Sequence, residues 1–136
     1  VDPPVPEPVD PDPVDDPELS PEAALLAYAA EKRWQIEVSG LQVQVSEGVY
    51  VSVPTTDRSK TLVTAASDII ADEQTIDFKS YDSGYVTVTG AQIRAFRAAI
   101  AIRLQQLFTA EKNIIADIEA GTITTEAEID AAFDLV

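Results

Sequence analysis

The sequence predicts an α+β fold with four helices, one of them long (about residues 90–120), and two short β-hairpins, preceded by an extended linker rich in proline and acidic residues. Three observations support this prediction. Seven of the nine prolines fall within residues 1–18, where they remove backbone donors and favour polyproline II. Two later stretches alternate apolar and polar residues around a glycine-containing turn, as β-hairpins do. The remaining segments repeat apolar residues at helical spacing.

We interpret residues 1–19 as a linker and residues 20–136 as one folded domain, a length that suffices for a single hydrophobic core. Residues 1–18 also carry seven acidic and no basic side chains, and their mutual repulsion extends the segment further. Pro3 to Pro6 fits the P-x-x-P pattern of groove-binding ligands but lacks a flanking basic residue, so we favour a spacer. Because position 1 is Val and the chain has no Met, we expect the C-terminal piece of a longer polypeptide rather than a processed chain.

The first helix is expected to begin at Ser20-Pro21-Glu22 and to stop near Gly40. Ser caps free N–H groups, Pro suits the first helical position, and Glu complements the positive end of the helix dipole. The end of this segment also alternates in the manner of a strand, at Trp34, Ile36 and Val38. The apolar residues on one helical face are Leu25, Leu26, Ala29 and Ile36.

Period-two alternation predicts a first hairpin from residues 41–45 and 49–53, joined by Ser46-Glu47-Gly48, and a second hairpin around Asp82-Ser83-Gly84. The apolar residues of the second hairpin are Ile76, Phe78, Val86 and Val88. Between the hairpins, Thr55-Thr56-Asp57 is expected to begin a helix. The apolar stripe of this helix is Leu62, Val63, Ala66, Ile69 and Ile70.

Thr89 and Gln92 stand three residues apart and predict a capping box for the long helix, which should end at Gly121. A helix of about 30 residues is about 45 Å long. A domain of this size cannot cover that length on one side, so we expect part of the apolar stripe to face another chain. The candidate interface residues on the stripe are Phe96, Ile100, Leu104, Leu107 and Phe108. A second capping box and the apolar residues of a short last helix are Thr125, Glu128, Ile129, Ala132 and Phe133.

Composition excludes two classes of partner. The net charge is −15, of which residues 1–18 carry −7, so phosphate backbones and anionic membrane surfaces repel the chain. Arg94, Arg97 and Arg103 interrupt the longest apolar stretches, so no segment is suited to cross a bilayer. We therefore predict that the chain binds no nucleic acid and does not insert into a membrane.

The chain has no Cys and no His, which leaves few groups for catalysis or metal binding. Carboxylate pairs arise by chance among 24 acidic residues, and none lies in an apolar run that favours the protonated acid. Asp77, Asp82 and Gly84 lack the spacing of a calcium loop and are better explained as turn residues. Residues 56–60 are better explained as a helix cap with surface charges than as an anion site, because no Gly-rich loop accompanies them. We therefore predict no enzymatic activity, no metal and no cofactor.

Four aromatic side chains in or beside the hairpins leave two interpretations open. If they are exposed, they can contact a sugar or a protein; if they are buried, they pack in the core. These residues are Trp34, Tyr50, Tyr81 and Tyr85.

Four blocks of the sequence are specific in combination. They are Ala29-Ala30-Glu31-Lys32-Arg33-Trp34-Gln35-Ile36-Glu37-Val38, Thr56-Asp57-Arg58-Ser59-Lys60, Ala120-Gly121-Thr122-Ile123-Thr124-Thr125 and Glu128-Ile129-Asp130-Ala131-Ala132-Phe133. Together they resemble a C-terminal domain family of tail-fibre and tail-fibre-assembly proteins from tailed phages and prophages. The likeness runs from about residue 24 to residue 134. Residues 72–88 are short and lack the Trp-containing stretch of that family, which offers no catalytic residue to carry over.

The resemblance implies a non-enzymatic tail component, part of a tail fibre or its tip, that contacts other phage tail proteins and helps attachment to the host. The alternative is an assembly chaperone that binds fibre protein and is not a permanent part of the virion. Arg58 and Lys60, which match the family, are expected to act as charges at the rim of an interface. Since tail fibres are commonly trimers, self-association as a trimer is a further expectation. The implied location is the virion, with the host cytoplasm during assembly.

Overall fold

The structure, a computed structural model, describes residues 19–82 and 84–136. Of the linker predicted for residues 1–19, residues 1–18 lie outside the described residues. The described part confirms the predicted α+β class, with four helices and two antiparallel strand pairs. In chain order its elements are α1 (Pro21–Glu37), β1 (Leu41–Ser46), β2 (Val49–Val53), α2 (Asp57–Ile69), β3 (Thr75–Lys79), β4 (Tyr85–Thr89), α3 (Gly90–Glu119) and α4 (Glu126–Asp134).

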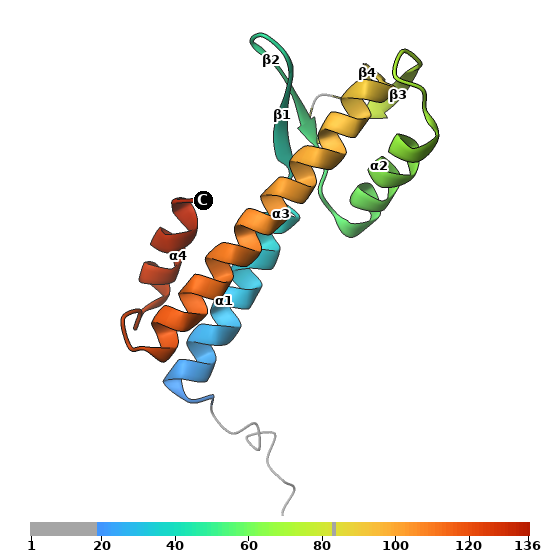
Figure 1. The fold of residues 1–136 in the computed structure, drawn as a ribbon. Coiled ribbons are helices and arrows are strands. Elements are labelled where there is room, and N and C mark those ends of the chain that lie inside the picture. Colours follow the sequence, from blue (N-terminus) through green and yellow to red (C-terminus); the bar gives the residue numbers. More distant parts are fainter. Residues whose placement is uncertain (1–18, 83) are drawn as a thin grey trace, which may run out of the picture.

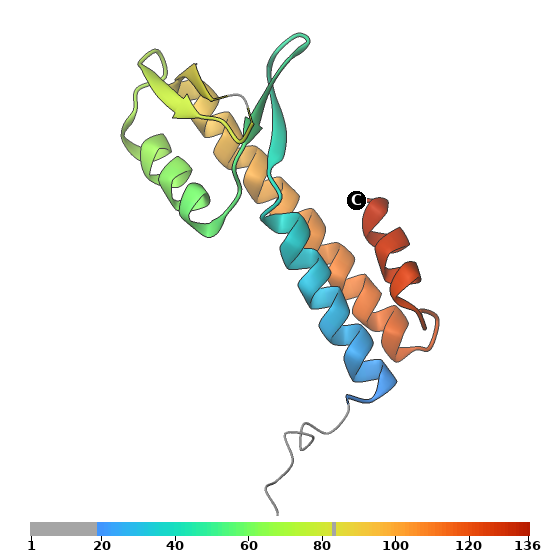
Figure 2. The ribbon, with the colours of Figure 1, turned by 180° about the vertical axis from the view of Figure 1, so that it is seen from behind.

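The long helix α3 is the spine of the domain, and the other elements pack along its two halves (Figure 1; Figure 2). Both hairpins and α2 lie beside the N-terminal half, whereas α1 and α4 lie beside the C-terminal half. Each half has its own buried apolar cluster. The cluster that we call the hairpin core is Val43, Val51, Val53, Val63, Val88, Ile93, Phe96 and Ile100. The cluster that we call the helical core is Ala29, Leu107, Ile114, Ile118, Ile123, Ile129 and Phe133.

Each helix of the described part begins with a hydroxyl side chain that accepts a hydrogen bond from a backbone N–H of the first turn. The predicted capping box of α3 is present, and the Thr89 N–H donates to Gln92 Oε1 at 2.9 Å. At α4, the Glu128 carboxylate accepts from the Thr125 hydroxyl at 3.0 Å and from the Thr124 N–H at 3.3 Å. These hydrogen bonds, led by the one from the Thr125 side chain, lower the pKa of Glu128 below its ordinary value.

The two hairpins follow the predicted alternation. Val43 lies opposite Val51 in the first hairpin, and Phe78 lies opposite Val86 in the second. The first turn places Gly48 at a φ of 73°, a conformation that costs a residue with a side chain about 1–2 kcal/mol. Each sheet has two strands, so each leaves strand edges that no third strand of its own sheet covers.

Three of the five candidate interface residues of α3 are buried inside the chain itself. Phe96 and Leu107 are 0% exposed and Ile100 is 7% exposed, so the prediction that they face a partner is wrong. The reasoning from helix length failed because other elements cover both halves of α3. The hairpins and α2 pack over Phe96 and Ile100, and α1 and α4 pack over Leu107. Leu104 is half-buried against the hairpin core, and Phe108 is 48% exposed.

Helix α2 buries only part of the predicted stripe: Val63 is buried and Ala66 packs against the hairpin core. Leu62 and Ile69 are 57% and 83% exposed, whereas Val63 and Ser67 are buried. A tertiary contact favours this rotation, because Arg97 of α3 donates to the Ser67 hydroxyl at 3.0 Å. A polar position therefore faces the neighbouring helix, and the large apolar side chain of Leu62 is left at the surface.

The junction between α2 and α3 depends on close contacts that the sequence pattern did not indicate. The Arg94 guanidinium donates to the carbonyl oxygens of Ser67 and Ile70, at 3.2 and 2.8 Å, and so caps the end of α2. Gly90 begins α3 so near to the preceding loop that a Cβ there would lie 2.1 Å from the carbonyl oxygen of Ala71. Only glycine fits this approach without a backbone shift.

Candidate functional site

A groove of about 600 Å³ lies between α2 and β3, beside the hairpin core. We call it the α2–β3 groove. Leu62, Val63 and Ala66 of α2 line it together with Ile93 of α3, so its floor is apolar. One wall is formed by the consecutive residues 76–81, from β3 and the turn that follows it. The volume falls within the range of sites that bind small molecules or peptide side chains.

The groove stays open because the large apolar side chains beside it do not fill it. Phe78 of β3 packs against Phe96 of α3, with ring centroids 5.1 Å apart, and so is directed into the hairpin core. Leu62 lines the groove with more than half of its surface exposed. Neither residue fills the space between α2 and β3, so the floor remains accessible.

Two cations line the α2–β3 groove without a charged partner among the described residues. Arg58 and Lys79 form no ion pair there, and Asp77 is a carboxylate on the same wall as Lys79. These cations are two of the four that form no ion pair with a described residue, and the other two, Arg103 and Lys112, lie outside the groove. Cations that do pair with a carboxylate are Lys32, Arg33, Lys60, Arg94 and Arg97.

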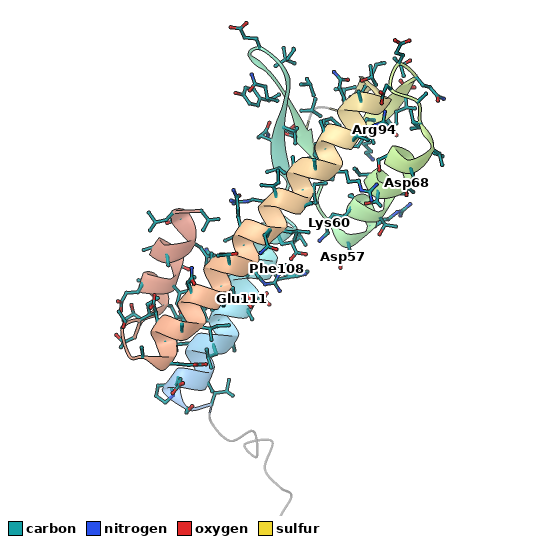
Figure 3. The ribbon with its side chains drawn as sticks, viewed as in Figure 1. Asp57, Lys60, Asp68, Arg94, Phe108 and Glu111 are labelled. Atoms are coloured by element: carbon teal, nitrogen blue, oxygen red, sulfur yellow. The ribbon has the colours of Figure 1, made fainter. Side chains whose placement is uncertain are left out.

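The other predicted rim charge, Lys60, belongs to a charge cluster that joins α1, α2 and α3. Its ammonium lies 2.5 Å from Glu37 and 3.2 Å from Asp57. Glu37 also pairs with Arg33 at 2.5 Å, and Arg33 pairs with Glu111 of α3 at 2.6 Å. Figure 3 shows Lys60 and Asp57 at the end of α2 that faces α3, and Glu111 further along α3 toward its C-terminal end. The cluster therefore connects the two halves of the domain.

The charges of this cluster are satisfied by one another. Burial acts to lower the pKa of Lys60, but hydrogen bonds to Glu37 and Asp57 outweigh it and raise the pKa above its ordinary value. The Arg33 guanidinium also lies over the Phe108 ring, 5.0 Å from its centroid, in cation–π geometry. Lys60 and Phe108 thus stabilise helix packing, and the cluster leaves no unpaired charge for a ligand.

Of the seven residues predicted for an interface, only Arg58 lines the α2–β3 groove. Sequence reasoning missed Leu62, which it placed on a buried stripe, and Lys79, which stands at the end of a short strand. The signal that could have suggested Lys79 is the lack of an acidic residue opposite it, since its cross-strand partner is Tyr85. The exposure of Leu62 had no signal in the sequence, because it depends on how α2 rotates against α3.

The four aromatic residues beside the hairpins are exposed, which excludes the core-packing interpretation for them. Tyr81 lines the α2–β3 groove at its end near Pro54. Its backbone N–H donates to the carbonyl oxygen of Ser52 in β2 at 2.8 Å. This hydrogen bond joins the two hairpins at one end of the groove.

Residues 19–82 and 84–136 offer neither a metal centre nor a helix that spans a membrane. No group of three or more His, Cys, Asp or Glu side chains in that part of the chain could hold a metal ion. No helix of the same part is long and apolar enough to cross a membrane. Among the described residues, the α2–β3 groove is the candidate site for a ligand or partner.

The fold and the groove define a small α+β domain built on one long helix, with an open apolar groove edged by cations. A family model described as a domain of unknown function (DUF4376) matches residues 20–133, and the chain belongs to that family. No curated protein and no solved structure matches the chain.

Proposed function

We propose that the chain is a non-enzymatic component of a bacteriophage tail, part of a tail fibre or its tip, and that it acts through contacts with other tail proteins. The observation that carries the proposal is the α2–β3 groove, whose apolar floor lies open between Arg58 and Lys79. Apolar surface rimmed by polar groups is typical of sites that bind proteins. The resemblance of four sequence blocks to phage tail domains supports the setting in the virion.

The chemistry of the groove favours binding over catalysis. A serine or tyrosine nucleophile needs an adjacent base, and histidine, the usual base near neutral pH, is absent from the chain. The polar residues that line the groove are Arg58, Ser59, Asp77, Lys79, Ser80 and Tyr81. Cations at the edge of an apolar surface instead steer and orient a partner of opposite charge.

A binding measurement with the fibre protein of the same phage tests the proposal. The full chain should form a complex by sedimentation velocity, and Arg58→Glu combined with Lys79→Glu should weaken it by about tenfold, since the new charges repel an acidic partner. The matched control combines Arg103→Glu with Lys112→Glu, two cations that also form no ion pair with a described residue but lie outside the groove. A chain that binds no tail protein, yet hydrolyses a glycan or an ester, would overturn the proposal.

Protein analysis of purified phage particles separates the two roles that the resemblance allows. A permanent tail component is present in particles at a fixed ratio to the fibre protein, and a ratio of one copy per fibre chain fits a trimer. An assembly chaperone binds the fibre protein in infected cells but is absent from purified particles.

A further inference from the structure

We propose that the α2–β3 groove binds an extended segment of another protein, which adds as a third strand to the free edge of β3. Its apolar side chains face the groove floor, and its acidic side chains lie beside Arg58 and Lys79. The inference rests on the proposed protein-binding function and specifies the partner's conformation and chemistry at that same site.

The hydrogen-bonding pattern of the second hairpin shows which backbone groups of β3 are free. In an antiparallel pair, only alternate residues exchange hydrogen bonds with the partner strand. The Ser80 N–H donates to the Gly84 carbonyl at 2.8 Å, and the Gly90 N–H donates to the Gln74 carbonyl at 2.9 Å. Both pairs continue the register in which β3 pairs with β4. The even-numbered residues of β3, Ile76 and Phe78, therefore bond to β4. The residues whose N–H and C=O groups point away from β4 are Thr75, Asp77 and Lys79.

Among residues 19–82 and 84–136, no strand pairs with this outward edge of β3. None of its three outward residues is joined by a backbone hydrogen bond to a described residue outside the hairpin. The next outward residue, Tyr81, does use its N–H, which donates to Ser52 of β2. The edge is therefore competent to pair with an extended backbone, and the structure pairs it only at the end where the two hairpins meet. An unpaired edge of this kind is a template for strand addition.

The groove floor sets the side-chain pattern of the added strand. Side chains of an extended segment alternate between two faces. In this position one face lies over Leu62, Val63, Ala66 and Ile93, which are apolar. The opposite face of the added strand lies on the solvent side of the sheet, together with the exposed side chains of Thr75, Asp77 and Lys79. An occupant with alternate apolar residues buries them on the floor and leaves its other residues at the surface.

The cations of the groove indicate which side chains the solvent-facing side of the added strand should carry. Lys79 is an outward residue of β3, and cross-strand pairs of opposite charge stabilise a sheet by about 0.2–1 kcal/mol. Arg58, from the start of α2, lines the same groove. Neither cation is neutralised by a described carboxylate. An occupant with acidic residues in alternate positions supplies the missing partners, whereas a basic occupant is repelled.

The test uses the full chain, labelled with ¹⁵N, and the synthetic peptide Val-Glu-Val-Glu-Val-Glu-Val with blocked termini. At saturating peptide, amide hydrogen exchange at Thr75, Asp77 and Lys79 should slow by about tenfold, because their N–H groups gain acceptors. Exchange at Ile76 and Phe78 should change little, since these residues already bond to β4. A uniform change along β3, or a change confined to another surface, would contradict strand addition.

Two changes to backbone donors test the pairing directly. A peptide methylated at alternate amide nitrogens, on the edge that faces β3, keeps its side chains and should bind about tenfold more weakly or not at all. Asp77→Pro removes an outward N–H of β3 and spares the ladder to β4, so the hairpin should persist while binding is lost. The matched control is Thr87→Pro, because Thr87 lies opposite Asp77 and its N–H points away from β3. A dispersed amide spectrum establishes that each variant is folded.

Side-chain variants test the two faces of the occupant. Leu62→Ser should weaken peptide binding, whereas Ile102→Ser, at an exposed apolar residue of α3 outside the groove, should not. Replacing Glu by Lys throughout the peptide should abolish binding to the wild-type chain. The same Lys peptide should bind the double variant Arg58→Glu, Lys79→Glu, because the charges of the groove are then reversed.

Other occupants are outcomes that overturn the inference. Saturation of the groove by a synthetic copy of residues 1–18 would assign it to the chain's own linker. Self-association that Asp77→Pro abolishes would assign it to a second copy of the chain. If no peptide binds but the chain still forms a complex with fibre protein, the strand-addition inference fails and the proposed function stands. If the peptide binds and no tail protein does, the proposed partner is wrong and the groove chemistry stands.

Discussion

The two halves of α3 carry opposite kinds of packing. Along the C-terminal half, α1 and α4 lie side by side with the spine, and their apolar faces close over the helical core. Along the N-terminal half, two separate hairpins and α2 surround the hairpin core but leave a groove and a free strand edge. Helices satisfy their own backbone groups, so a helical bundle can close completely. A two-stranded sheet cannot, because each strand has one edge without a partner.

This difference assigns stability and binding to opposite ends of one domain. The helical half holds the paired charges of Arg33, Glu37 and Glu111, which are mostly buried between helices. The hairpin half holds Arg58 and Lys79, which form no ion pair with a described carboxylate, beside an exposed apolar floor. We infer that the bundle supports the hairpins, as rigid elements support a binding site placed at their end.

The largest effect is expected from a charge placed in the helical core. Leu107→Asp buries an unpaired carboxylate at a residue that is 0% exposed, and should destabilise the domain by on the order of 4 kcal/mol. The control is Ile102→Asp, on the exposed side of the same helix, which should cost less than about 1 kcal/mol. Urea unfolding followed by circular dichroism measures both. Equal losses for the two variants would mean that α3 does not bury the face described here.

The junction at the hairpin end should be the next most sensitive position. Gly90→Ala places a Cβ against the Ala71 carbonyl oxygen and forces a backbone shift, at a cost of about 3 kcal/mol, the upper end of the usual cost of overpacking. Gly48→Ala is the comparison, because its Cβ meets open space and only the positive φ opposes it. We expect about 1 kcal/mol there. A Gly90→Ala variant as stable as the wild type in thermal unfolding would show that the loop containing Ala71 can shift at little cost in free energy.

Breaking an ion pair should cost more stability in the helical half than in the hairpin half. Arg33→Met removes the cation shared by Glu37 and Glu111, whose side chains are mostly buried, and should cost about 1.5–3 kcal/mol. Asp68→Asn breaks an ion pair with Arg97 whose side chains are 49% and 62% exposed, and it leaves the Arg97 hydrogen bond to Ser67 in place. An exposed pair of this kind contributes about 0–1 kcal/mol. Chemical unfolding in low and high salt should show the larger loss for Arg33→Met, and the reverse order would contradict the assignment.

The smallest effect is a pH dependence in the contact between α1 and α4. The Tyr28 hydroxyl donates to Asp130 Oδ1 at 2.7 Å, and this hydrogen bond raises the pKa of Tyr28 to about 12. The folded state therefore binds the phenolic proton more tightly than the unfolded state, whose pKa is the ordinary 10.0. The contribution to stability is complete below pH 10 and is lost as the pH rises toward 12.

Tyr28→Phe is the matched variant for that prediction. The difference in unfolding free energy between wild type and variant should be constant below pH 10 and should shrink above it. Absorbance titration of tyrosine ionisation should also lose its most alkaline step in the variant. A step near 10 for all the tyrosines of the wild-type chain would show that the hydrogen bond is not made in solution.

Much of the local structure could be predicted from the sequence because its causes are local. Ser20, Thr89 and Thr125 begin helices by capping N–H groups within the next turn, and this requires no distant contact. Gly48 permits the turn of a hairpin whose alternation is visible in Val43 and Val51. The element order and the α+β class follow from such signals, which the described residues confirm.

The candidate site could not be predicted in the same way. The stripe on α3 correctly marked Phe96 and Leu107 as apolar positions, but not what covers them, since any apolar neighbour serves equally well. Arg58 was identified as a surface charge because its residue type is polar. Its pairing state depends on which carboxylates come near it, and the sequence alone does not contain those distances.

What the sequence by itself determined is the set of elements, their caps and turns, and the absence of thiol and imidazole chemistry. What only the tertiary structure decided is which face each element buries. The rotation of α2 hides Ser67 behind Arg97 and exposes Leu62, and the register of β3 turns the backbone of Asp77 outward. The physical reason is that caps and turns are set by neighbours in the chain, whereas burial and free edges are set by packing between segments far apart in it.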